Sequence, residues 1–259
     1  MKKLFNVFTF LGLVSIGFLF SGSTIKDDVS KKKSITSKRI VVLELFTSQG
    51  CSSCPLADVL LEKYIFENNP NIIALSFHVD YWNYIGWNDP FSQAQFSERQ
   101  RIYAEKLHSS VYTPQLFING KWQGIGSNKK EIEEQISKEL KLESDYKFTI
   151  HSQIENDNQI KVEFDSDSLQ KNLVLNLVIA KKKTTTVIKR GENKGLELNN
   201  NNVVLSLNSF KINSQNTLEC TLKFKKEWNS EDYILVAYVQ NSKTGVILSA
   251  QKNELNQSL

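Results

Sequence analysis

The stretch that decides the fold is IVVLELFTSQGCSSCP, which spans residues 40–55. Its first eight residues, Ile40–Thr47, are almost continuously apolar or β-branched, which is typical of a central strand buried on both faces. Residues 48–50 interrupt this run, and Pro55 fits the first turn of a helix. The stretch therefore predicts a strand that leads into a helix through a turn containing two cysteines.

The two cysteines of this turn, Cys51 and Cys54, are separated by two serines. Thiol–disulfide chemistry needs a thiolate nucleophile, a second thiol within reach, and a positive potential that lowers the pKa of the first thiol. The free N–H groups and the dipole at the start of a helix supply that potential. The spacing predicts a redox pair in which Cys51 attacks and Cys54 resolves the mixed disulfide.

Two other interpretations of the pair remain open. An oxidising environment favours a permanent structural disulfide that never turns over. A copper-handling site is the other alternative, with His78 as its third ligand. A structural zinc site is disfavoured because the sequence has no second cysteine pair. No metal and no other cofactor is expected.

The residues that follow predict further elements of an α/β domain. Residues 72–79 form a second apolar run, and Asp89, followed by a proline, is expected to cap a helix. Asn119-Gly120 favours a type I′ hairpin turn between two short strands. Asn128 resembles the start of a capping box for a closing helix. The order β-α-β-α-β-β-α assigns residues 40–143 to this domain.

After residue 143 the apolar pattern changes to a period of two. Seven short runs separated by turn residues predict a second domain, an all-β sandwich over residues 144–259. Cys220 shares a strand face with apolar residues and is expected to be a buried, inert thiol. Residues 190–193 are interpreted as a turn between strands, with docking against the redox domain as the alternative.

The N-terminal segment, residues 1–23, has two lysines, an uncharged apolar run and a small-residue end, which predicts a signal peptide. Residues 24–39 are polar and are expected to form a linker. Removal of the signal lowers the formal net charge from +4 to +2, which argues against nucleic-acid binding. We expect an exported chain, periplasmic or extracellular, that touches the membrane only through this segment and stays anchored if the signal is uncleaved.

Together with FTSQGCSSCP, the strand ending in HVD (residues 78–80) and YTPQLFINGK (residues 112–121) make the chain resemble the thioredoxin superfamily. The resemblance implies an α/β thioredoxin-like domain followed by the sandwich-like domain. It also implies a cis peptide bond between Thr113 and Pro114 beside the sulfurs, with the preceding backbone pairing with an extended substrate chain. In thioredoxins an acid lies beneath the cysteines, whereas this chain has Leu45.

The chain is more closely similar to a family of secreted bacterial thioredoxin-like proteins catalogued as a domain of unknown function. The similarity runs from about residue 39 to about residue 250 and has no assigned reaction. It is carried by LELFTSQGCSSCPLAD, HVDYWNYIGWNDPF, YTPQLFINGK, IKRGENKGLELNNNNVV and VAYVQNSKTGVILSA. Leu56 is a departure, because the family commonly has a second proline there.

Further candidate site residues surround the cysteines in this interpretation. Glu44 lies within an apolar run and Asp80 at the end of a strand, so both are candidate catalytic acids. An edge-facing or salt-bridged glutamate is the alternative for Glu44. Trp82, Trp87 and Tyr112 are candidate substrate-binding residues, with a small core beneath the loop as the alternative for the tryptophans.

The function expected from the sequence is disulfide exchange with thiols or disulfides of envelope or secreted proteins. Cys51, Cys54, Thr113 and Pro114 carry the chemistry in this interpretation. The alternatives are a non-catalytic binding module with a structural disulfide, and a copper-handling protein.

Overall fold

The computed structural model describes residues 37–144, 146–155, 158–166, 170–212, 214 and 216–255. The expected signal peptide (1–23) and residues 24–36 of the expected linker lie outside the described residues. Those described belong to one compact unit. Among them, no helix has both the length and the apolar character needed to cross a bilayer.

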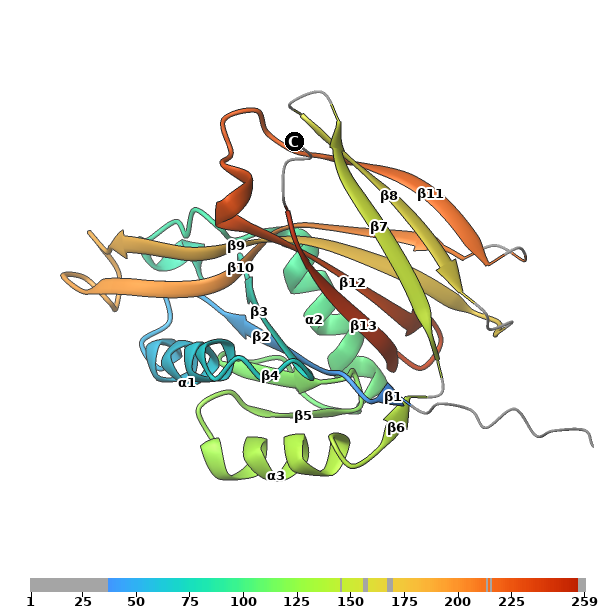
Figure 1. Ribbon diagram of the computed structural model, residues 1–259. Coiled ribbons are helices and arrows are strands. Elements are labelled where there is room, and N and C mark those ends of the chain that lie inside the picture. Colours follow the sequence, from blue (N-terminus) through green and yellow to red (C-terminus); the bar gives the residue numbers. More distant parts are fainter. Residues whose placement is uncertain are drawn as a thin grey trace, which may run out of the picture. The chain divides into compact units, whose positions relative to one another are not determined.

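The central feature of the fold is a mixed sheet of eight strands (Figure 1). Strands β2, β3 and β10 run parallel to one another, and the other neighbours are antiparallel. In sheet order, the strands are β13 (Ile247–Glu254), β12 (Tyr233–Asn241), β9 (Leu173–Val187), β10 (Glu197–Lys211), β3 (Ile72–His78), β2 (Val41–Thr47), β4 (Gln115–Ile118) and β5 (Trp122–Ile125).

A smaller antiparallel sheet, in the order β11-β8-β7, packs against β9 and β12 of the large sheet through one apolar cluster. Its strands are β7 (Phe148–Glu155), β8 (Gln159–Ser166) and β11 (Thr217–Lys223). The alternating burial of β8 shows why this sheet forms, because every second side chain faces the shared core. A two-stranded pair, β1 (Ser37–Lys38) with β6 (Glu143–Ser144), completes the strands.

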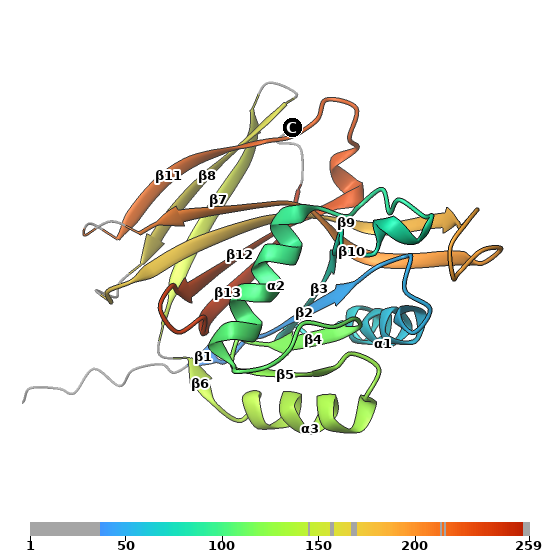
Figure 2. The ribbon, with the colours of Figure 1, turned by 180° about the vertical axis from the view of Figure 1, so that it is seen from behind.

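Helices cover both faces of the large sheet. α1 (Cys54–Phe66) and α3 (Lys129–Glu139) pack on the face formed by alternate residues of β2 and β4. α2 (Ala94–Lys106) lies on the opposite face, as the view in Figure 2 shows. Its Phe96 and Tyr103 belong to the apolar core on that face. Side chains of β2 thus enter two cores, which explains its continuous apolar sequence.

The expected fold class, an α/β thioredoxin-like domain followed by an all-β sandwich-like domain, is wrong. The described chain is mostly β, with thirteen strands and three α-helices. One sheet runs through both halves, because β10 pairs with β3 and Val203 lies opposite Ser76. The error has a physical reason: alternation of apolar residues predicts strands and their buried faces, but it does not say which strand edges will pair.

Four consecutive asparagines of β10, residues 199–202, lie at this junction between the halves. Asn202 adopts a left-handed φ of 45°, and its side-chain amide donates to the backbone carbonyl of Ala74 in β3 over 2.9 Å. Asn200 and Asn201 beside it are also buried. A stretch that reads as low complexity in the sequence therefore helps to join two parallel strands.

Several local predictions are confirmed, and one is wrong. Asn119 and Gly120 both have positive φ in the β4–β5 turn, and the Asn128 side chain accepts a hydrogen bond from the Glu131 N–H. Cys220 is a buried free thiol. The helix expected to begin at Asp89 begins at Ala94 instead, because the Asp89 carboxylate is bonded to the cysteine turn described below.

Candidate functional site

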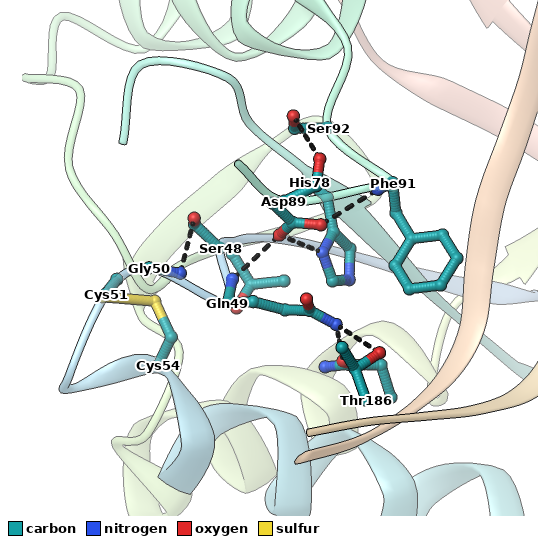
Figure 3. A network of polar contacts seen from close by, with 12 residues as sticks. Ser48, Gln49, Gly50, Cys51, Cys54, His78, Asp89, Phe91, Ser92 and Thr186 are labelled. Atoms are coloured by element: carbon teal, nitrogen blue, oxygen red, sulfur yellow. Dashed lines mark hydrogen bonds and ion pairs between the residues drawn. A yellow bond between two sulfur atoms is a disulfide. The ribbon is translucent and has the colours of Figure 1, made fainter. Parts of the chain in front are cut away.

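Cys51 and Cys54 form a disulfide in the turn between β2 and α1, with their Cα atoms 5.5 Å apart (Figure 3). The Cys51 N–H donates to the carbonyl of Ser48, and the Cys54 N–H donates to the carbonyl of Cys51. The hydroxyl oxygen of Ser53 lies 3.4 Å from the sulfur of Cys51. We call residues 48–54 the cysteine turn. It places Cys51 just before the first turn of a helix.

The Thr113–Pro114 peptide bond is cis, as the resemblance to thioredoxins implies. The Pro114 carbonyl accepts a hydrogen bond from the N–H of Gly126 over 2.9 Å. A Cβ at Gly126 would lie 3.2 Å from the Cβ of Pro114 and 3.1 Å from the Cβ of Ala57 in α1. Pro114 therefore lies close to the turn of α1 that follows Cys54.

Both sulfur-bearing residues are buried beneath the loop that joins β9 to β10. Cys51 is 1% exposed and Cys54 is fully buried. From this β9–β10 loop (residues 188–196), the Asn193 amide donates to the carbonyls of Gln49 and Cys51 over 2.9 and 3.0 Å. Glu192 accepts a hydrogen bond from the N–H of Ser52 over 3.0 Å. The loop therefore both connects two strands and covers the cysteine turn.

The predicted substrate-binding tryptophans both lie beside the cysteine turn. The indole N–H of Trp82 donates to the hydroxyl of Thr113 over 2.7 Å, and that of Trp87 donates to the side-chain carbonyl of Gln49 over 3.2 Å. Both rings are half-buried. Tyr112 is bonded instead to Gln123 in β5.

Beneath the turn, a buried ion pair joins β3 to the loop that precedes α2. His78 Nδ1 lies 2.7 Å from Asp89 Oδ2, and both side chains are fully buried. Asp89 also accepts hydrogen bonds from the backbone N–H groups of Gln49 and Phe91 (Figure 3). This explains why Asp89 does not cap α2. The ion pair holds one edge of the cysteine turn in place.

This arrangement shifts the pKa values of both partners. Burial acts to raise the pKa of Asp89, but the charge of His78 and the hydrogen bonds to the carboxylate outweigh it and hold the pKa below its ordinary value. Burial acts to lower the pKa of His78, and the neighbouring Asp89 raises it above its ordinary value. Each partner therefore favours the charged form of the other.

Gln49 connects the cysteine turn to the β-rich half of the chain. Its side-chain N–H₂ group donates to the hydroxyl of Thr186 in β9 and to the side-chain carbonyl of Asn200 in β10, both over 3.1 Å. The sequence does not predict Gln49 and Asn200 as site residues, and it predicts Asp89 only as a helix cap. Asn193 lies within residues 190–193, for which docking against the cysteine-bearing half is the alternative interpretation. The signal that could have found them is their position inside the stretches that carry the family similarity.

The two predicted catalytic acids are both hydrogen-bonded to residues of α2. Glu44 points to the α2 face of the sheet, where it accepts hydrogen bonds from Arg99, Tyr103 and Tyr238. Asp80 is bonded to Ser97 in α2. The alternative interpretation of Glu44, a salt-bridged glutamate, agrees with its contact to Arg99. Glu44 lies on the face of β2 opposite to α1.

The copper alternative depends on His78 as a third ligand beside the two cysteines. Over the described ranges, no group of three or more His, Cys, Asp or Glu residues is placed to hold an ion. Nδ1 of His78, the third copper ligand in the alternative interpretation, is bonded to Asp89.

Comparison with solved structures places the chain beside a protein from Agrobacterium tumefaciens whose crystal structure is known. It is 25% identical, and the match covers 86% of this chain and 98% of that one with a TM-score of 0.61. A domain of the outer membrane lipoprotein Omp28 from Porphyromonas gingivalis is 17% identical, over 44% of this chain and 92% of that one. Its TM-score of 0.27 carries no structural argument.

No curated protein matches this chain. Residues 42–240 match a family described as protein of unknown function (DUF1223). This match confirms the predicted similarity to a family catalogued as a domain of unknown function, and it does not extend to the thioredoxin superfamily. The chain belongs to the DUF1223 family of proteins of unknown function.

Proposed function

We propose that this chain is an exported protein that exchanges disulfides with thiols of envelope or secreted proteins through Cys51 and Cys54. The observation that carries the proposal is the disulfide between these residues at the start of a helix. After reduction, a Cys51 thiolate would lie near the N-terminus of α1 and the hydroxyl of Ser53, both of which stabilise negative charge. Export rests on the apolar segment within residues 1–23.

The exchange proceeds in two steps. A partner thiolate attacks the sulfur of Cys51, the Cys51–Cys54 bond breaks, and Cys54 leaves as a thiolate that takes up a proton. A second partner thiolate then attacks the partner sulfur of the mixed disulfide, and Cys51 leaves as a thiolate. The partner loses two electrons and the cysteine pair gains them. The reduction potential of the pair decides whether this direction or its reverse prevails.

Access to Cys51 requires the β9–β10 loop to move, because the residue is 1% exposed. Movement breaks the hydrogen bonds that Glu192 and Asn193 make with the cysteine turn. The backbone N–H of Ser52 then becomes free to pair with another chain, and the carbonyl of Cys51, which keeps only its hydrogen bond from the Cys54 N–H, can accept a second one. This favours a partner that presents its cysteine in an extended segment.

The burial of both sulfurs favours a second candidate function, a binding module in which the disulfide is permanent. In this case the bond stabilises the cysteine turn and does not take part in turnover. The two candidates differ in the reduction potential of the pair, because structural disulfides have potentials below about −300 mV.

The test is to equilibrate the full chain with dithiothreitol redox buffers and to measure the potential of the Cys51–Cys54 pair. A value above about −300 mV supports exchange, and a lower value supports the permanent disulfide. A Cys54→Ser variant, expressed with its leader, should trap mixed disulfides with envelope proteins through Cys51. Cys51→Ser is the matched control, and equal trapping by both variants would contradict the assigned roles.

A further inference from the structure

Asp58 is a buried acid on the same helix face as the inner cysteine. It follows Cys54 by four residues in α1, and both side chains are buried against the sheet. Residues four apart on a helix are neighbours, with Cβ atoms about 5–6 Å apart. The carboxyl group therefore belongs to the layer that contains the sulfur of Cys54.

The hydrogen bonding of this carboxyl group is incomplete. Oδ2 accepts a long hydrogen bond of 3.3 Å from the hydroxyl of Thr47, and no well-formed hydrogen bond reaches the buried Oδ1. An ionised carboxylate in such a place lacks the compensation that buried charges ordinarily have. One oxygen is therefore free to carry a proton.

The groups that face Asp58 come from every element packed around it. They are His78 of β3 with its partner Asp89, Thr47 of β2, and the amide of Asn200 in β10. Of these only His78 and Asp89 titrate, and they form an ion pair in which the charge of His78 lowers the pKa of Asp58 by more than the charge of Asp89 raises it. Burial is the largest influence, and it raises the pKa of Asp58 to about 7. An ordinary thiol has a pKa of about 8.5, so a proton can pass between a thiol and this carboxyl group at small cost.

We propose that Asp58 accepts the thiol proton of Cys54 when Cys54 resolves a mixed disulfide on Cys51, and returns it when the pair is reduced again. The proton moves from Cys54 to the carboxylate, and the resulting thiolate attacks the sulfur of Cys51. The bond between Cys51 and the partner breaks, and the partner leaves as a thiolate. The pair loses two electrons and the partner gains them. This inference rests on the proposed exchange function.

The experiment follows the reaction of the reduced full chain with Ellman's reagent. The first thionitrobenzoate is released when Cys51 forms the mixed disulfide, and the second is released when Cys54 resolves it. Cys220 does not interfere, because burial raises the pKa of this thiol to about 11. The rate of the second release, measured from pH 5 to pH 9, reports the deprotonation of Cys54.

In the wild type, we expect the second rate to rise with a midpoint near pH 7, the pKa of Asp58. Asp58→Asn should slow it about 10²-fold at neutral pH, a typical contribution of a general base, and should move the midpoint above pH 8. Asp58→Glu, which restores a carboxyl group, should return the midpoint toward neutrality. Glu62→Gln, which removes another acid of the same helix, should leave the profile unchanged.

Two results would overturn the inference, and they are distinguishable. An Asp58→Asn profile identical to that of the wild type excludes Asp58 and leaves the exchange function standing. A wild-type protein that releases no second thionitrobenzoate excludes the exchange itself. The wild-type profile is also a test that needs no variant, because a midpoint above pH 8 would exclude Asp58 as the acceptor.

Discussion

The side-chain amide of Asn193 donates to the backbone carbonyl of Cys51 over 3.0 Å, although 142 residues separate them in the chain. The same amide also donates to the carbonyl of Gln49. A loop from the opposite half of the chain is therefore hydrogen-bonded to the cysteine turn.

Replacing Asn193 by alanine should accelerate reduction of the disulfide by dithiothreitol about tenfold or more. Two hydrogen bonds to buried carbonyls are lost, and each contributes about 0.5–1.5 kcal/mol to the closed position of the loop. Stopped-flow measurement of thiol appearance gives the rate. Lys194→Ala, which changes the exposed neighbour, is the control. Equal rates in the two variants would show that the loop does not limit access.

Asp89→Asn should destabilise the protein by about 3–5 kcal/mol at pH 7, the usual cost of breaking a buried ion pair. The lowered pKa of Asp89 stabilises the fold above its unfolded value of 3.8, and this contribution disappears as the pH falls through the folded pKa. The difference between variant and wild type should therefore shrink below about pH 4. Urea unfolding from pH 3 to pH 7 measures this difference in the free energy of unfolding. A difference that stays constant over this range would contradict a stabilising ion pair between Asp89 and His78.

Asp58 should have the opposite effect on stability. Its carboxyl group has a pKa of 3.8 in the unfolded chain and about 7 in the fold, so folding takes up a proton between these values. The free energy of unfolding of the oxidised wild type should fall from pH 4 to pH 7 through this group, by up to about 4 kcal/mol. Asp58→Asn should remove this dependence in guanidinium titrations. A variant that is equally pH-dependent would place the titration elsewhere.

Arg99→Met should cost about 3–5 kcal/mol of stability, because it leaves the fully buried Glu44 carboxylate without its cation. The double variant Glu44→Gln with Arg99→Met should recover part of this loss. Since both residues lie on the α2 face, the reduction potential of the cysteine pair should stay unchanged in the folded variants. A shifted reduction potential would show that Glu44 influences the cysteine pair after all.

Gly120→Ala should destabilise the protein more than Gly195→Ala. Both glycines have positive φ, at 62° and 88°, so an alanine at either position is strained. A Cβ at Gly120 would also overlap the backbone carbonyl of Gly245, whereas nothing lies within 4 Å of one at Gly195. We expect a cost of about 1 kcal/mol at Gly195 and clearly more at Gly120, read from thermal unfolding. Equal costs would show that the β4–β5 and β12–β13 turns are not in close contact.

The sequence predicts correctly those features of the fold that depend on residues close together in the chain. The strand before Cys51, the helix after it and the turn at Asn119-Gly120 each follow from a local pattern of apolar or turn-forming residues. These patterns also placed the cysteine pair at the start of a helix, where it is found.

The other features of the fold and of the site depend on contacts between strands that are distant in the sequence, and local patterns do not encode such contacts. The burial of Cys51 requires Asn193, and the position of Asn193 follows from the pairing of β10 with β3. Asp58 reads as an ordinary polar residue of a helix until the sheet that buries it is known. Glu44 is near the cysteines in the sequence but not in the fold, because its side chain points to the α2 face of β2 whereas the cysteines lie at the start of α1.

The pairing of β10 with β3 also determines which pieces of this chain can exist alone. A cut near residue 143 would leave β3 as an edge strand with an unpaired row of N–H and C=O groups, and would leave β10 with a second such edge. Edges of this kind recruit other chains, so each fragment is expected to aggregate or to seek its missing half. Co-expression of residues 1–143 with residues 144–259 should therefore reconstitute the protein as a non-covalent complex. In this complex each fragment covers the unpaired strand edge of the other.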